Sequence, residues 1–158
     1  MSLRFQHDGA EISLRPATQG DFDWAFDVKC DAMRTHIEAK WAWDEAFQLA
    51  LHETRWNEKP WFVIALAAAP IGTISLHWLP THLRIGEFYL RNTHRGRGIG
   101  GRLLTKILEQ CDAQHREVRL EALRWNPVQN LYARHGFKIV SGNEIHYFMT
   151  RRPNKFMF

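Results

Sequence analysis

The segment 95–101 constrains this chain more than any other part of it. It reads Arg-Gly-Arg-Gly-Ile-Gly-Gly and lies between a strand expected at 85–90 and an amphipathic helix expected at 99–114. Glycines at a strand-to-helix junction let backbone N–H groups approach an anion, and the helix N-terminus adds partial positive charge. Arg95 and Arg97 add formal charge. The sequence therefore predicts a site for a phosphate-bearing cofactor.

The size and composition favour a single soluble domain. The chain has 158 residues, of which 45% are hydrophobic and 24% charged, so we expect one domain over residues 1–158 with a core at about 11–152 and short flexible termini. No apolar run approaches the roughly 20 residues needed to span a bilayer, and the first ten residues lack the apolar core of a secretion signal. We expect a cytoplasmic protein that binds no membrane.

The net charge of +4 is compatible with nucleic acid or with an anionic cofactor. The arginines crowd the glycine segment instead of forming an extended run, which favours one compact anionic ligand over nucleic acid. Cys30 and Cys111 lack the spacing of metal ligands and fall on apolar helix faces. We expect buried free thiols and no metal.

The pattern of apolar residues predicts the order βααβββαβαββ, a mixed α/β fold with a meander in the middle. Thr18 with Asp21, Asp44 and Pro127 mark the starts of three helices. A turn is expected around Pro70, and a hairpin is expected around residues 141–143. The strands are expected at 11–15, 61–66, 71–76, 85–90, 118–123, 137–140 and 145–150.

The glycines allow two interpretations. Gly96-x-Gly98-x-x-Gly101 fits the dinucleotide fingerprint, and Glu121 stands about 20 residues further on, where a ribose-binding acid belongs. However, the polar run 91–94 separates the glycines from the strand, and too little chain follows Gly101 for further βαβ units. A nicotinamide-dependent oxidoreductase is therefore the remote alternative.

The second interpretation uses Arg95-x-x-Gly98-x-Gly100, which resembles the segment of the GNAT acyltransferases that cradles the pyrophosphate of acetyl-CoA. Residues 126–137 resemble that family's Asn-(helix)-Leu-Tyr-x-x-x-Gly-Phe segment, and the element order is similar over 12–150. Asn92 stands where the family usually has proline. The resemblance implies a GNAT fold, with a mixed, mostly antiparallel sheet flanked by helices, and an acetyl-CoA-dependent N-acetyltransferase.

The resemblance also implies how acetyl-CoA is held. Backbone N–H groups of 97–101 would bind the pyrophosphate, and main-chain groups of Leu90 and Arg91 would meet the pantetheine arm. Asn126 would contact that arm, cap the helix at Pro127, or do both. The cofactor-binding residues so implied are Leu90, Arg91, Arg95, Gly96, Arg97, Gly98, Ile99, Gly100, Gly101 and Asn126.

For catalysis, the resemblance implies that Tyr132 protonates the departing thiolate; packing between helix and sheet is its other role. Glu87 and Glu121 are the candidate bases, and each could instead be a structural ion-pair partner. His94 and His146 are weaker candidates on pKa alone. With no persuasive nucleophilic cysteine, direct transfer in a ternary complex is favoured over an acyl-enzyme.

The acceptor is expected to be an amine of a small molecule or peptide. Trp41 and Trp43 fall where the family forms part of its acceptor pocket, although most tryptophans are core residues. A non-catalytic CoA-binding module of the same fold is the main alternative. The basic, aromatic tail could pack on a partner subunit, which makes a homodimer one alternative; it contains Arg151, Arg152, Lys155, Phe156 and Phe158.

Overall fold

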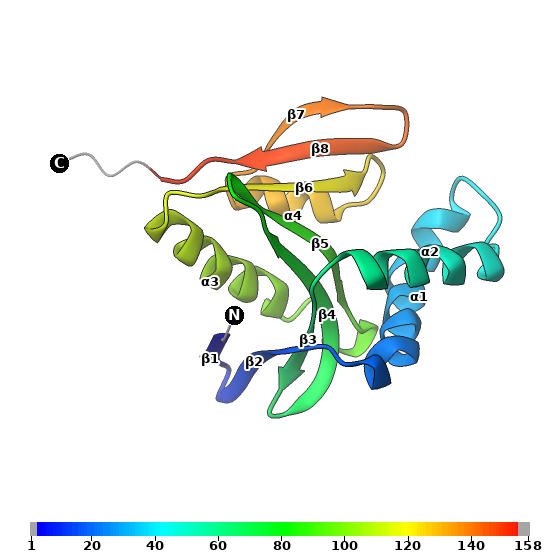
Figure 1. Cartoon of the computed structure of the whole chain (residues 1–158), viewed down its shortest axis with the longest axis horizontal. Helices are drawn as coiled ribbons and strands as arrows, with labels where there is room; N and C mark the ends of the chain where they lie inside the picture. The colour runs from blue at the N-terminus through cyan, green and yellow to red at the C-terminus, as the bar shows by residue number, and fades with distance from the viewer. Residues whose placement is uncertain (1–2, 155–158) are drawn as a thin grey trace. The chain divides into compact units, whose positions relative to one another are not determined.

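The computed structural model describes residues 3–154, and this part contains eight strands and four α-helices (Figure 1). The fold is mixed α/β with mostly antiparallel strands, as predicted. The elements are β1 (Leu3–His7), β2 (Ala10–Pro16), α1 (Phe22–Glu38), α2 (Glu45–Glu58), β3 (Trp61–Leu66), β4 (Ala69–Trp78), β5 (His82–Leu90), α3 (Ile99–Ala113), β6 (Glu117–Leu123), α4 (Val128–Arg134), β7 (Lys138–Gly142) and β8 (His146–Arg151).

The contacts divide the chain into two compact units. The first contains the residues up to Leu76 together with Glu87–Ile99, and the second contains His77–Gly86 and the residues from Gly100 onward. Strand β5 contributes to both. The strand order is β1-β2-β3-β4-β5 in the first unit and β5-β6-β8-β7 in the second.

The N-terminal residues correct the prediction. Residues before 11 were expected to form a flexible terminus, but β1 pairs with β2 in an antiparallel hairpin. Its turn is Asp8-Gly9, with φ values of +49° and +80°. Such a pair suits the type I′ turn, whose twist matches that of the flanking strands. The order therefore gains one strand at its start.

The other elements of the first unit follow the prediction closely. The Asp21 carboxylate accepts a hydrogen bond from the Thr18 N–H (2.8 Å), and the Asp44 carboxylate accepts one from the Phe47 N–H (3.0 Å). Both helix starts are thus confirmed. The β3–β4 turn is displaced: it lies at residues 67–68, where two alanines adopt positive φ, and Pro70 is already in β4.

The second unit contains the predicted C-terminal elements. Strands β7 and β8 form the expected hairpin, β8 pairs antiparallel with β6, and β5 pairs parallel with β6. Helix α4 packs against β6. The Arg151 guanidinium, on β8, pairs with the Asp112 carboxylate of α3 at 2.8 Å. The apolar face of α3 is buried as predicted, at Leu103, Leu104, Ile107, Leu108 and Cys111.

Expectations from the sequence also concern the two cysteines, membrane and metal binding, and the C-terminal tail. Both cysteines are free; Cys111 is buried as predicted, whereas Cys30 is only partly buried. Burial raises the pKa of Cys111 to about 11 and also raises that of Cys30. Within residues 3–154, no helix is long and apolar enough to cross a membrane, and His, Cys, Asp and Glu form no metal-binding group of three or more. Lys155, Phe156 and Phe158 lie outside the described residues.

Candidate active site

The glycine segment lies between a strand and a helix, as the sequence predicts. A short 3₁₀ turn, Asn92–His94, follows β5, and α3 begins at Ile99. Between them, Gly96 and Gly98 adopt φ values of +75° and +79°. This left-handed conformation is accessible to glycine at little cost, whereas a side chain would strain it. The chain can therefore turn sharply and direct backbone N–H groups to one side at the start of a helix.

Arg95 anchors the entry to this segment. Its guanidinium donates to the Leu90 carbonyl at 2.9 Å and lies 3.6 Å from the Asp31 carboxylate of α1. The same carboxylate accepts a hydrogen bond from the Asn92 N–H at 2.7 Å. Part of the Arg95 charge is therefore already matched within the first unit, which leaves Arg97 as the less committed cation of the pair.

Strand β4 approaches the end of β5 closely. The Arg91 N–H donates to the Ile71 carbonyl at 2.9 Å. A Cβ atom on Gly72 would lie 2.3 Å from the Tyr89 carbonyl oxygen, so glycine is required at this point. The Arg91 N–H and the Leu90 carbonyl thus have partners within the protein, which limits the main-chain groups left for a pantetheine arm.

His7 is a residue of this region that the sequence reasoning missed. It lies on β1, and its Nε2 is 3.0 Å from the Arg97 carbonyl oxygen. A Cβ atom on Gly98 would lie 3.6 Å from its ring. The N-terminal hairpin therefore supports the glycine segment. The Asp8-Gly9 pair was the signal that could have revealed this hairpin.

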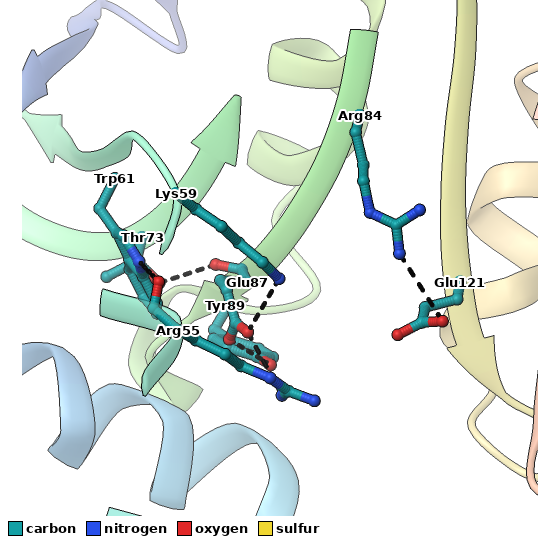
Figure 2. Close-up of polar contacts among 8 residues, drawn as sticks. All are labelled: Arg55, Lys59, Trp61, Thr73, Arg84, Glu87, Tyr89 and Glu121. Carbon is teal, nitrogen blue, oxygen red and sulfur yellow. Dashed lines mark hydrogen bonds and ion pairs between the residues drawn. The ribbon is translucent and has the colours of Figure 1, made fainter. Parts of the chain in front are cut away.

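Glu87, on β5, is buried among polar groups (Figure 2). One carboxylate oxygen lies 3.3 Å from the Arg55 guanidinium and 3.7 Å from the Lys59 ammonium. The other accepts a hydrogen bond from the Tyr89 hydroxyl at 3.0 Å. Only 3% of the Glu87 side chain is exposed. Both oxygens are therefore engaged and largely shielded from water.

The backbone at Glu87 is also unusual. Its φ is +48°, which is uncommon for a residue with a side chain and costs free energy. The Thr73 hydroxyl of β4 donates to the Glu87 carbonyl at 2.9 Å and holds this conformation (Figure 2). The carboxylate is thus aimed by a strained backbone that a neighbouring strand supports.

Glu121, on β6 in the second unit, lies in a different environment. It faces the Arg84 guanidinium at 3.7 Å, and 35% of its side chain is exposed (Figure 2). This single long contact in water holds the carboxylate weakly. Of the two predicted bases, Glu121 is therefore the less constrained and the more accessible to water.

Tyr132 and Asn126 also belong to the second unit. Tyr132 is buried in α4, where its ring packs against Phe137 at 5.7 Å between centroids, and burial raises the pKa of its hydroxyl. The phenol is thus kept protonated, the form that can donate. Asn126 accepts a hydrogen bond from the Val128 N–H at 3.0 Å. Its capping role is therefore confirmed, and its contact with a pantetheine arm stays a prediction.

The remaining candidates are two tryptophans and two histidines, of which only His146 lies in the second unit. Trp41 is exposed after α1, whereas Trp43 is half-buried with the Arg34 guanidinium over its ring at 5.4 Å. His94 is hydrogen-bonded to the Thr93 hydroxyl at 2.8 Å. His146, on β8, lies beside the Phe148 ring, with 6.4 Å between the ring centroids. Glu87 and most of the glycine segment lie in the first unit, whereas the second unit contains Gly100, Gly101, Glu121, Asn126 and Tyr132.

A sequence profile of the Acetyltransferase (GNAT) family matches residues 23–137. The chain belongs to the GNAT acetyltransferase family. The match contains both segments on which the resemblance was based, so Arg95-x-x-Gly98-x-Gly100 is favoured over the dinucleotide interpretation. Membership supports acetyl transfer with CoA as co-substrate. No curated protein matches the chain.

Solved structures confirm the GNAT fold. The PaiA N-acetyltransferase of Thermoplasma acidophilum, in complex with coenzyme A, aligns with a TM-score of 0.72 at 18% identity, over 89% of this chain and 98% of that one. A GNAT acetyltransferase of Elizabethkingia anophelis with acetyl-CoA bound gives 0.64 at 16%, over 89% and 97%. The ribosomal-protein-S18-alanine N-acetyltransferase of Escherichia coli gives 0.67 at 12%, over 92% and 96%. At such identities the likeness concerns the fold.

Proposed function

We propose that this protein is an N-acetyltransferase that transfers the acetyl group of acetyl-CoA directly to a primary amine of a small molecule or peptide. The observation that supports this most is the glycine segment, where Gly96 and Gly98 adopt positive φ immediately before α3 in a GNAT family member. Backbone N–H groups of 97–101 would hold the pyrophosphate, and Arg97 would add charge.

The reaction forms a bond between the amine nitrogen and the acetyl carbon and breaks the carbon–sulfur bond of the thioester. The amine loses one proton, and the CoA thiolate gains one. The neutral amine attacks the thioester carbonyl carbon, and the carbon–sulfur bond then breaks. Tyr132 is proposed to protonate the departing CoA thiolate, because burial keeps its hydroxyl protonated. The amine gives up its own proton to a carboxylate, for which Glu87 and Glu121 are the candidates.

Direct transfer agrees with the state of the two cysteines. Burial raises the pKa of both thiols, so neither is largely thiolate at neutral pH. A thiol in that state is a poor nucleophile. An acetyl-enzyme on cysteine is therefore disfavoured.

Release of CoA thiol from acetyl-CoA across a panel of amines tests the proposal. Tyr132→Phe should lower turnover by about 10²-fold with little change in acetyl-CoA affinity, as expected for loss of a general acid. Tyr147→Phe, on β8 under the Arg124 guanidinium, is the matched control and should leave turnover unchanged. Acetyl-CoA binding without thiol release on any amine would instead identify a non-catalytic module.

A further inference from the structure

The inner face of α2 is polar where an amphipathic helix would normally be apolar. Gln48, His52, Arg55 and Lys59 follow one another at helical spacing, the last directly after the helix ends. Gln48 and His52 are buried. Burial lowers the pKa of His52, so this imidazole adds no charge at neutral pH. The last two residues of this polar face, Arg55 and Lys59, are the cations that contact Glu87.

Lys29, on α1, adds a third cation to this region. Only 2% of it is exposed, and its ammonium has no hydrogen-bond partner within residues 3–154. The same holds for the Gln48 side-chain oxygen and His52 Nδ1. Burial lowers the pKa of Lys29, and Glu87 is the carboxylate that acts most strongly in the opposite direction. Trp43 Nε1 is a fourth such atom in the first unit. Buried polar groups normally have partners, so this group of atoms on α1, α2 and the segment between them requires an explanation.

The charges in this region do not balance. Arg55 and Lys59 contact one carboxylate, Glu87, and the buried ammonium of Lys29 interacts with it electrostatically. We name these four residues the Glu87 cluster. Both Glu87 oxygens are already engaged. Positive charge in a poorly hydrated site is costly unless an anion accompanies it. The side chains of Arg55 and Lys59 keep 30% and 22% of their surface exposed, so an anion can reach them from solvent.

We propose that the Glu87 cluster binds a carboxylate of the acetyl acceptor, so that the acceptor is an amino acid or a similar amine with a carboxylate. This rests on the proposed acetyl transfer. A guanidinium and an ammonium side by side suit a carboxylate, because charge-assisted hydrogen bonds are stronger than neutral ones. The same excess of positive charge disfavours polyamines and aminoglycosides, since like charges repel at a partly buried site.

Matched acceptors test this directly. The panel contains the L-amino acids, each beside its carboxamide, which keeps the amine and side chain but removes the negative charge. We expect kcat/KM to be at least about 10-fold higher for the acids. Arg55→Met should lower kcat/KM for the acids by about 10- to 100-fold, the effect of one charge-assisted hydrogen bond, and change that for the amides by less than about twofold.

Controls separate this inference from the proposed function. Arg4→Met removes an exposed arginine that pairs with Glu11 on the N-terminal hairpin. It should change kcat/KM neither for the acids nor for the amides. Lys59→Met replaces Arg55→Met if the latter fails to fold. Calorimetry with acetyl-CoA tests the proposed function alone, and Arg55→Met should keep its affinity.

Binding of the reaction products decides the inference even without turnover. N-acetyl amino acids and N-acetyl carboxamides are titrated into the protein, with CoA present and absent. A preference for the acids that Arg55→Met abolishes supports the inference. Equal binding or equal reaction of acids and amides, or no binding of either, overturns it. If the preference is present but acetyl-CoA does not bind, the proposed function fails and the carboxylate site stands.

Discussion

Glu87 and Glu121 have the same side chain, and both lie on strands, yet their environments differ sharply (Figure 2). Glu87 is 3% exposed and contacts two cations and a hydroxyl, whereas Glu121 is 35% exposed and faces one guanidinium at 3.7 Å. The first carboxylate is fixed, and its chief effect is on the charge of its surroundings. The second is held by one long contact and is accessible to water. Residue type alone therefore does not assign a base.

The largest expected difference between the two is in stability. Glu87→Gln leaves Arg55 and Lys59 without their carboxylate and should lower the free energy of unfolding by about 2–3 kcal/mol. The loss is smaller than for a fully buried pair because Arg55 and Lys59 contact water. Glu121→Gln loses an exposed pair and should cost less than about 1 kcal/mol. Urea unfolding of both variants measures this. Equal losses would show that the Glu87 carboxylate stabilises the fold no more than the exposed Glu121 carboxylate.

A smaller effect of opposite sign is expected at Lys29. Burial lowers its folded-state pKa below the value of about 10.4 in the unfolded chain, so its charged form destabilises the fold. This penalty is fully present below the folded pKa and disappears as the pH rises past the unfolded one. Lys29→Met should therefore raise the melting temperature at pH 7, and raise it less at pH 10. A lower melting temperature at pH 7 would mean that the ammonium is well compensated.

Local signals in the sequence predicted much of the fold. The helix starts at Thr18 and Asp44 and the amphipathic α3 followed from capping and periodicity, and they are confirmed. The hairpin at Asp8-Gly9 had a signal that was not used. The β3–β4 turn was expected around Pro70, but its position at residues 67–68 had no signal, because alanine gives no indication of positive φ.

The site was predictable in part. The conformation of the glycine segment followed from its residue types. The contacts of His7 with Arg97 and of Asp31 with Arg95 join residues far apart in the chain, so no local pattern indicates them. The periodicity of α2 places its polar residues on one face, but only the fold brings that face to Glu87.

Calorimetry with two alanine variants tests most directly the claim that the segment 95–101 binds the phosphates of acetyl-CoA. Gly98→Ala and Gly9→Ala both place a side chain at nearly the same φ, +79° and +80°, and both have room for it. Backbone strain of about 1–2 kcal/mol should be similar in the two. We expect wild type and Gly9→Ala to bind acetyl-CoA alike, and Gly98→Ala to bind it at least about 10-fold more weakly. Undiminished binding by Gly98→Ala would contradict the claim.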